Sequence, residues 1–579
     1  MQVIQREIQK SLPVISDNAV LDRIYKSRGI KSAEDLNYSL SRLPSPFLLS
    51  GMKDMVDYLE DALATQKKIV IVGDFDADGA TSSAVGLLGL KILGFTNVDF
   101  LVPDRFKHGY GLTPSIVRES LQKSPDILLT VDNGISSFEG VALAKALNLT
   151  VLITDHHLPS DEIPDAHAIV NPNLKGDLFP SRAMAGVGVM FYVLGALMIR
   201  LKKNNKLDPK VGLGSLLDLV ALGTVADLVP LDNVNRIFVY NGLKRIKDLK
   251  GRPGINALLT VAGKDIRKTT ESDFGFAVGP RLNAAGRMDD MSIGIDCLIA
   301  TTDHEAMQLA TQLNDFNIAR RAVEEDMKTD ALKYLNEDEI NYRGDGLCLF
   351  DENWHQGVIG ILASRIKDMT YKPVIAFAPG DEGYVKGSAR SIPGIHIRDA
   401  LSNIAKDHPE ILSKFGGHAM AAGLSIKKSD LPLFTALFDA EIKSLSAGID
   451  LTQTLYTDGK LKSDDLTLTL ANTLISSGPF GQGFPEPSFE GDFKVSSVKV
   501  LKDKHLKFML RTGKGKTISA IKFNVEDAYK WESVAQLSVV YKLSVNEFRG
   551  DCTLQLMLDH IEDTKAINSL KHEFLLMAS

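Results

Sequence analysis

A short apolar run, Ile69–Val72, is followed at once by the acidic segment Gly73-Asp74-Phe75-Asp76-Ala77-Asp78-Gly79. All four apolar residues are β-branched, which favours a buried strand. Carboxylates at the end of such a strand are costly to bury unless a positive charge lies among them. A divalent metal ion is the simplest source of that charge. The segment therefore predicts a metal site at a strand end.

The acidic segment is also compatible with two simpler structures. Its letters match the start of a calcium-binding EF-hand loop, which needs a bidentate Glu at its twelfth position. Counted from Asp74, that position is Val85, and a strand rather than a helix is predicted before the loop. Both observations argue against an EF-hand. A solvated acidic turn is the second alternative, and it would suffice if the segment stood alone.

The segment does not stand alone, because further β-favouring runs also end in polar residues. Residues 126–131 lead into Asp132-Asn133-Gly134, residues 150–154 into Asp155-His156-His157, and residues 98–102 into Pro103-Asp104-Arg105. Helical stretches lie between them, which predicts a doubly wound parallel α/β sheet. Ligands gather at the carboxyl ends of the strands in such sheets. We therefore expect these side chains to converge: Asp74, Asp76, Asp78, Asp132, Asp155, His156 and His157, joined by Asp227 after a predicted helix at 216–224.

The types of these residues indicate the metal. Carboxylate oxygens with one or two imidazoles, and no nearby Cys, favour Mn²⁺ or Mg²⁺ over structural zinc. One octahedral Mg²⁺ usually takes only one or two carboxylates, so this many acids predict two ions. Paired ions are typical of phosphoester hydrolysis, in which they stabilise both the attacking and the leaving oxygen.

These residues also carry a family resemblance. The triplet Asp155-His156-His157, the 74–79 motif, Asp132 and Asp227 together resemble the DHH phosphoesterase superfamily. Further motifs are similar to those of its RecJ family of single-strand-specific 5′→3′ DNA exonucleases: GPRLNAAGR at 279–287, WHQGVIG at 354–360, GSARS at 387–391 and GGHAMAAG at 416–423. The resemblance runs from about residue 25 to the last hundred residues, with the motifs in the family's order.

The resemblance implies a role for each candidate ligand. One ion would be held by Asp74, Asp76 and Asp132. The other would be held by Asp78, Asp132, His156 and Asp227, so that Asp132 bridges the two. Several relatives have His where this chain has Asp74, which leaves open whether Asp74 or Asp76 dominates at the first ion. His157 is expected to support a ligand or face the phosphate, and we group it with Asp76 and Asp132 as catalytic.

Degradation from one end of a strand needs a pocket for a terminal phosphate. Arginine suits that role because it binds phosphate oxygens in bidentate fashion. The predicted pocket residues are Arg105, Arg281, Ser388 and Arg390. His418 is expected to face the cleft, and Tyr110 to pack against a base or sugar in an entrance too narrow for duplex. For Arg287 and Asn283, a structural role is an equal alternative.

Composition limits the class of protein. A net charge of −7 and a pI of about 6.0 do not suit a protein that coats DNA indiscriminately, so nucleic-acid binding must come from local basic surfaces. The Cys residues are scattered, and no secretory signal is visible. The uncharged stretch 183–199 is predicted to be a buried helix on the sheet rather than a membrane span. We expect a cytoplasmic enzyme.

Five segments are predicted along the chain. They are a helical cap at 1–45, a metal-binding α/β domain at 46–300, a long connecting helix at 301–340, a second α/β domain at 341–450 and a β domain with a tail at 451–579. The resemblance implies that the fourth is a DHH-associated domain and the last an OB-like barrel. Nine Lys or Arg and one acid lie between Lys494 and Lys522, interleaved with Phe493, Phe508 and Phe523. Such a pattern binds single strands, although lysines that merely solvate strand faces are the alternative.

The expected function is a two-metal, single-stranded-DNA-specific exonuclease that releases 5′-mononucleotides in DNA repair and recombination. By resemblance, its expected partners are a single-strand-binding protein and a helicase. We expect the enzyme to be a monomer that does not bind a membrane. The main alternative is a DHH phosphodiesterase for short RNA oligomers or cyclic dinucleotides, or a pyrophosphatase; these relatives generally lack a basic β domain. A DNA-binding factor without catalysis should have lost some of the acids or histidines, and all are present.

Overall fold

The computed structural model describes residues 1–564 except 10, 106, 338–343 and 382. The chain forms two compact units, each assembled from separated stretches. The first contains residues 1–45, 228–243 and the chain from 454 onwards; the second contains residues 46–227 and 244–453. The end of the predicted connecting helix at 338–340 and the tail at 565–579 lie outside the described residues.

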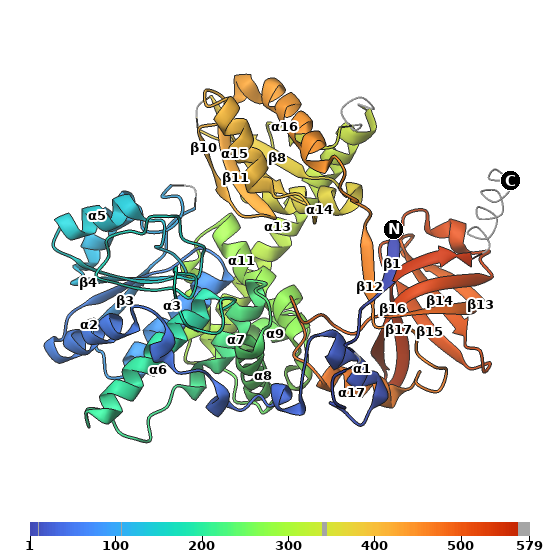
Figure 1. The fold of residues 1–579 in the computed structure, drawn as a ribbon, viewed down its shortest axis with the longest axis horizontal. Helices are drawn as coiled ribbons and strands as arrows, with labels where there is room; N and C mark the ends of the chain where they lie inside the picture. The colour runs from blue at the N-terminus through green and yellow to red at the C-terminus, as the bar shows by residue number, and fades with distance from the viewer. Residues whose placement is uncertain (10, 106, 338–343, 382, 565–579) are drawn as a thin grey trace. The chain divides into compact units, whose positions relative to one another are not determined.

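The second unit begins with the predicted parallel sheet. Its strand order is β3-β2-β4-β5-β6, and every neighbouring pair is parallel (Figure 1). The strands are β2 (Ile69–Val72), β3 (Val98–Leu101), β4 (Ile127–Val131), β5 (Thr150–Thr154) and β6 (Ala168–Val170). Because β2, β4 and β5 are almost wholly buried, their sequences are continuous apolar runs. The doubly wound fold class is thereby confirmed.

Helices cover both faces of this sheet. Val70 and Val72 pack with α4 (Pro114–Ser120) and α5 (Phe138–Ala146), whereas Ile71 lies against α3 (Ala77–Ile92) on the other face. The uncharged stretch forms most of α6 (Gly186–Lys203), which is largely buried as expected but packs mainly on α3 rather than directly on the sheet. Gly89 permits this contact, since a Cβ there would lie 2.2 Å from Leu194 Cδ1. In the described part of the chain, no helix has both the length and the apolar character needed to cross a membrane.

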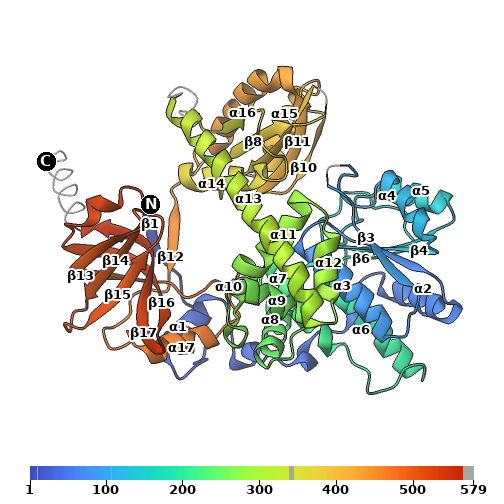
Figure 2. The ribbon, with the colours of Figure 1, turned by 180° about the vertical axis from the view of Figure 1, so that it is seen from behind.

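Further helices of the unit lie on either side of the sheet in sequence. Helix α2 (Met52–Thr65) precedes it, and α7 (Leu217–Ala226), α9 (Pro253–Val261), α11 (Gly279–Met288) and α12 (Ser292–Ile299) follow it. A π-helical turn, Phe274–Val278, leads directly into α11. The predicted long helix is α13 (Asp303–Glu337), whose 35 residues give a length of about 50 Å (Figure 2).

A second, mixed sheet follows α13, with the strand order β10-β11-β9-β8-β7. Its strands are β7 (Leu347–Phe350), β8 (Val374–Pro379), β9 (Tyr384–Arg390), β10 (Lys414–Gly417) and β11 (Ala421–Lys427). Helices α15 (Ile397–Asp407) and α16 (Leu431–Ser446) pack on one face of this sheet, and α14 (Ile359–Thr370) packs on the other.

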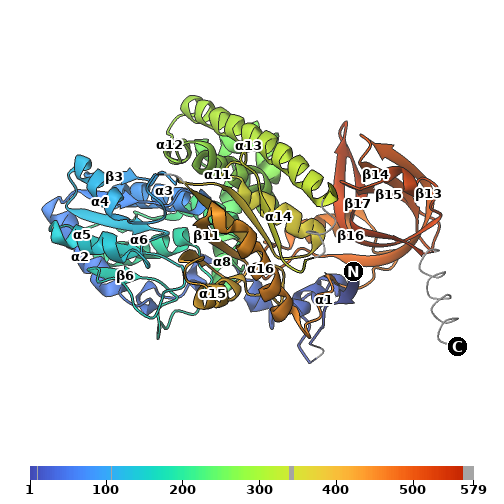
Figure 3. The same cartoon turned by 90° about the horizontal axis from the view of Figure 1, so that it is seen from above.

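The first unit contains a closed barrel with the strand order β13-β14-β15-β17-β16 (Figure 3). Its strands are β13 (Phe489–Leu501), β14 (His505–Arg511), β15 (Thr517–Lys522), β16 (Gln536–Phe548) and β17 (Asp551–Asp563). The N-terminal helix α1 (Ala19–Ser27) and α17 (Leu468–Ser476) belong to the same unit. The N-terminal segment also contains β1 (Gln2–Gln5), which pairs in parallel with β12 (Thr454–Thr457).

The barrel corrects one expectation about aromatic platforms. Phe493 and Phe508 are core residues, 6% and 0% exposed, because they point into the barrel from β13 and β14. Phe523, just after β15, is exposed. Basic residues occupy the outward positions instead, and they face one another across β13 and β14 as the pairs Lys494–Arg511 and Lys499–Lys507.

Candidate metal centre

The predicted acids and histidines lie at element ends along one edge of the parallel sheet. Asp74 follows β2, Asp132 follows β4, and His156 and His157 follow β5. Asp76 is the N-cap of α3 and accepts hydrogen bonds from the backbone amides of Asp78 and Gly79. Asp78 lies in the first turn of α3, and Asp227 is the C-cap of α7. The carboxyl ends of parallel strands therefore gather side chains that are far apart in sequence.

His156 is the centre of this cluster. Its Nε2 lies 3.0 Å from Asp132 Oδ1, 3.6 Å from Asp227 Oδ2 and 3.9 Å from Asp78 Oδ2. The potential ligand atoms form three groups, and within each group all atoms lie within 4.8 Å of one another. The groups are Asp74, Asp76 and Asp132; Asp78, His156 and Asp227; and Asp132, His156 and His157. Asp132 is common to two of them, as a bridging ligand would be.

Glycines let helices approach the cluster closely. A Cβ on Gly186, the first residue of α6, would lie 2.6 Å from Asp132 Cβ. The backbone amides of Gly186 and Val187 donate to Asp78 Oδ2 and Oδ1, at 2.6 Å and 3.1 Å. On α7, a Cβ at Gly223 would lie 2.8 Å from Asp78 Oδ1. Asp78 is thus held in one orientation by the N-terminus of α6.

Burial and mutual repulsion disfavour the ionised form of the clustered carboxylates, as is expected of a site that binds cations. Burial, followed by the charges of neighbouring carboxylates, raises the pKa of Asp78 to about 7 and the pKa values of Asp74, Asp132 and Asp227 well above their ordinary range. Burial and the nearby His157 lower the pKa of His156 to about 4, which leaves a neutral imidazole able to bind a metal.

Two buried atoms at the centre of the cluster support the same conclusion. Asp132 Oδ1 and His156 Nε2 lie 3.0 Å apart without the geometry of a hydrogen bond, and neither atom has another partner among the described residues. Buried polar atoms in native proteins normally have a partner, so this unsatisfied pair indicates a site that binds a further ligand. Carboxylates with a neutral imidazole are the donor set that Mn²⁺ and Mg²⁺ accept. The residues present therefore fit divalent ions.

His157 differs from His156 in both partner and charge. Its Nδ1 lies 2.7 Å from Asp155 Oδ1, and Asp155 Oδ2 accepts a hydrogen bond from the backbone amide of Ile135. Burial opposes protonation of His157, but the hydrogen bond and charge of Asp155 outweigh it and raise its pKa to about 9. The rings of Tyr110 and His418 lie near that of His157, with centroids 5.8 Å and 6.2 Å from its own. His157 is therefore a cation beside the carboxylate cluster.

Arginines gather beyond this cluster. Arg105 stacks on Phe75 at 4.1 Å, Arg390 Nη1 donates to Ser388 Oγ at 3.2 Å, and Arg287 Nη1 donates to the carbonyl of Gly357 at 3.0 Å. Burial, then the charges of Arg105 and Arg390, lowers the pKa of Arg287 to about 9. These like charges lie close enough to repel, which is the arrangement expected of an anion site.

The structure places Arg281 elsewhere. Its guanidinium donates to the Ala277 carbonyl at 2.8 Å and to Asn314 Oδ1 at 3.1 Å, and the nearby charge that affects it is that of Arg321. Arg287, at the end of the same motif, joins Arg105 and Arg390 instead. Asn283 has a structural contact, since its Oδ1 accepts the Ala77 amide at 2.8 Å.

Comparisons with known proteins agree with this architecture. Family models match the DHH family N-terminal domain at residues 68–224, the DHHA1 domain at 344–444 and the RecJ OB domain at 457–560.

Named relatives match almost the whole chain. The single-stranded-DNA-specific exonuclease RecJ of Haemophilus influenzae is 45% identical over 96% of this chain and 98% of its own length. Its Escherichia coli namesake is 44% identical over 97% of this chain and 99% of its own length. The crystal structure of RecJ in complex with Mn²⁺ from Thermus thermophilus matches with a TM-score of 0.79 at 28% identity, covering 97% of this chain and 80% of that one. With all three domains present in that order, the chain belongs to the RecJ family.

Proposed function

We propose that this chain is a metal-dependent exonuclease that degrades single-stranded DNA in the 5′→3′ direction and releases 5′-mononucleotides. The observation that carries the proposal is the buried cluster around His156 and Asp132, whose ligand geometry, unsatisfied atoms and raised carboxyl pKa values suit divalent cations. Its relatives are named single-stranded-DNA-specific exonucleases, which supports the choice of substrate.

Asp74, Asp76 and Asp132 would hold one ion, and Asp78, Asp132, His156 and Asp227 the other. When bound, Mn²⁺ or Mg²⁺ would lower the pKa of a water molecule and stabilise the charge on the reacting phosphate. The protein keeps His156 neutral and Asp78 fixed, and it holds His157 as a cation through Asp155. We propose that His157 binds a non-bridging oxygen of the scissile phosphate, with Tyr110 placing the adjoining base or sugar.

The arginine group would select the end of the strand. Arg105, Arg287 and Arg390, with the Ser388 hydroxyl, form a half-buried donor set that suits a terminal 5′-phosphate. Of the residues predicted for this pocket from sequence, Arg281 is not adjacent to the others, so we propose that Arg287 takes its place. His418 would close the cleft beside His157.

The barrel favours a long strand over a dinucleotide. Like charges directly opposite each other destabilise a sheet, yet exposed Lys494–Arg511 and Lys499–Lys507 pairs lie side by side on β13 and β14. A bound polyanion would offset that cost. We therefore propose single-strand binding on this face, which a phosphodiesterase for cyclic dinucleotides would not need.

We also propose a cytoplasmic, monomeric enzyme that acts in DNA repair and recombination with a helicase and a single-strand-binding protein. The support is membership of the RecJ family.

Product analysis tests the proposed function. A uniformly labelled, 5′-phosphorylated single strand would be incubated with Mn²⁺, Mg²⁺ or EDTA, alongside a blunt duplex and a cyclic dinucleotide. We expect 5′-mononucleotides from the 5′ end of the single strand alone, and none in EDTA. Cleavage of the cyclic dinucleotide with the long strand intact would reassign the substrate.

Arg390→Ala should abolish the preference for a 5′-phosphate over a 5′-hydroxyl. Loss of charge-assisted hydrogen bonds to phosphate should lower kcat/KM for the 5′-phosphorylated strand by about 10- to 100-fold, leaving the 5′-hydroxyl strand within a few fold. Arg281→Ala is the matched comparison, and it should retain the preference. Competition between the 5′-phosphorylated and 5′-hydroxyl strands measures the preference of each variant. If Arg281→Ala loses the preference and Arg390→Ala retains it, Arg281 rather than Arg390 binds the terminal phosphate.

A further inference from the structure

One face of the second sheet is covered only in part. Ile375, Phe377, Val385 and Leu424 point to the face that packs against α15 and α16. On the other face, Leu362, Ala363 and Ile366 of α14 pack against the alternate residues of β8, which are Val374, Ala376 and Ala378. The same face of β11 and β10 is open: Gly423 and Gly416 are exposed, and a Cβ on Gly416 would meet nothing within 4 Å.

The residues on this open face form rows across the strands. Arg390 pairs with Ala421, and Ser388 pairs with Gly423, which pairs with Gly416. The next two rows lie successively farther from the arginine group: Lys386, Ser425 and Lys414; then Tyr384 and Lys427. A floor of glycine and serine thus leads from the proposed phosphate pocket to a basic and aromatic end. The two ends, Tyr384 and Arg390, lie six positions apart on β9, which is a distance of about 20 Å.

Charge along this path is of one sign. None of Lys386, Lys414 and Lys427 forms an ion pair with a described carboxylate, and no acid occupies these rows. The adjacent Lys428 is different, since its ammonium pairs with Glu352 and lies 5.7 Å from the ring centroid of Phe350. Lys386, Lys414 and Lys427 therefore place positive charge without an ion-pair partner in the described structure along the open face.

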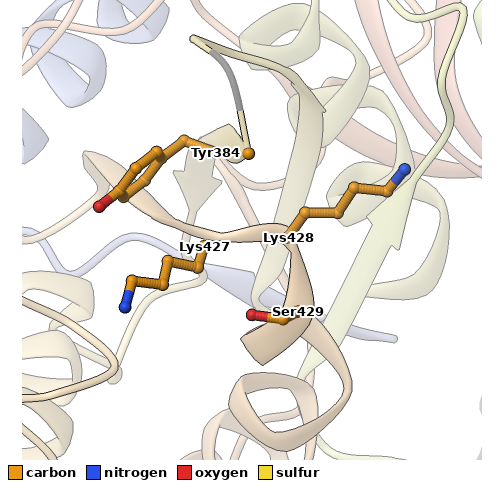
Figure 4. A pocket seen from close by; sticks show the side chains of 5 residues that line it. Tyr384, Lys427, Lys428 and Ser429 are labelled. Atoms are coloured by element: carbon orange, nitrogen blue, oxygen red, sulfur yellow. The ribbon is translucent and has the colours of Figure 1, made fainter.

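The far end of the path is hollowed. A cavity of about 600 Å³ is lined by Gly383, Tyr384, Lys427, Lys428 and Ser429. Tyr384 and Lys427 extend to the same side of the strands, whereas Lys428 points away from them (Figure 4). Tyr384 is 45% exposed, so its ring is accessible to a ligand from solvent.

We propose that the open face is a track for the single strand whose 5′ end occupies the metal centre, and that the Tyr384–Lys427 hollow is a second nucleotide-binding site on it. The Tyr384 ring stacks on a base and Lys427 contacts a phosphate, a combination that binds single strands regardless of sequence. At a stacked spacing of about 3.4 Å per nucleotide, the 20 Å path holds at most about six nucleotides. This site rests on the proposed function and deepens it.

The test compares a long substrate with one too short to reach the hollow. Full-length enzyme would be assayed with Mn²⁺ on 5′-phosphorylated oligothymidylates of two and twenty nucleotides. For the double variant Tyr384→Ala/Lys427→Gln we expect KM on the 20-mer to rise about tenfold with kcat unchanged. Both parameters on the dinucleotide should stay within twofold. Lys443→Gln is the matched control, because this exposed lysine lies on α16 at the covered face of the sheet, and it should behave as the native enzyme on both substrates.

Salt dependence gives an independent readout. In EDTA, the slope of log affinity against log salt for the 20-mer should decrease in magnitude by about 0.7 in Lys427→Gln, the loss of one single-strand phosphate contact. If native enzyme cleaves the 20-mer and the double variant equals it in KM and salt slope, the second site is absent. Equal losses on both substrates would also overturn it, since the defect would then lie at the metal centre. Native enzyme that leaves both substrates uncleaved would refute the proposed function itself.

Discussion

Asp132→Asn is expected to lower kcat on single-stranded DNA by about 10³- to 10⁴-fold. Asp132 is the carboxylate shared by two of the ligand groups, and its Oδ1 lies 3.0 Å from His156 Nε2. Asparagine is the informative replacement because Asp132 has a φ of +62°, a region that Asn tolerates and Ala does not. The substitution keeps the backbone and the volume and removes only the charge.

The stability of the same variant separates a metal-site defect from misfolding. Loss of the Asp132 charge relieves its repulsion with Asp74, Asp78 and Asp227, so the variant in EDTA should unfold at the native Tm or above. Added Mn²⁺ should raise that Tm less than it raises the native one. Asp289→Ala, an exposed acid outside the ligand groups, is the control and should keep native kcat. A native kcat in Asp132→Asn would show that Asp132 is not an essential metal ligand.

Asp458→Ala is expected to destabilise the barrel unit by about 3–5 kcal/mol. The Asp458 side chain is 0% exposed and forms an ion pair with Arg28, which is 1% exposed. A second guanidinium contact joins Nη2 to Oδ2 at 2.9 Å, and the Ser488 amide donates to the same oxygen at 3.0 Å. Removal of the carboxylate would leave a buried guanidinium without its counter-charge, which is far more costly than loss of an exposed pair.

The chain offers a matched control in Arg42–Glu34, an exposed ion pair in the same N-terminal segment. Glu34→Ala should change the free energy of unfolding by less than about 1 kcal/mol. Denaturant unfolding followed by tryptophan fluorescence in a Trp354→Phe background would report on the barrel unit, since Trp531, the other tryptophan of the chain, lies within it. Equal effects of the two substitutions would show that the Arg28–Asp458 pair is not a major source of stability.

The parallel sheet and its ligand edge were predictable because four of the five strands, all but β6, are short β-favouring runs that end in polar residues. The parallel arrangement then brings the strand ends together whatever the loops do. Arg281 and Arg287 could not be distinguished, since six residues on α11 place them on different faces and only packing decides which faces the arginine group. Strand β1 was missed because four residues carry too little pattern, and its partner lies at the far end of the chain.

The core positions of Phe493 and Phe508 did have a sequence signal. Phe508 alternates with Leu506 and Leu510, the period of two that marks the interior row of a strand. Attention to strand parity would have assigned the lysines to the outside and the aromatic rings to the inside. Composition alone could not separate a stacking platform from a core residue.

The pairing of β1 with β12 also has a consequence for synthesis. Arg6 and the Tyr456 carbonyl that it contacts are 450 residues apart, so the N-terminal segment leaves the ribosome long before its partner exists. At about 5–20 residues per second, that interval is roughly 20–90 s. Throughout it, the edge of β1 is open to other strands, and the intervening unit can fold completely. The N-terminal segment should therefore become protected from proteases later than the unit that follows it in the chain.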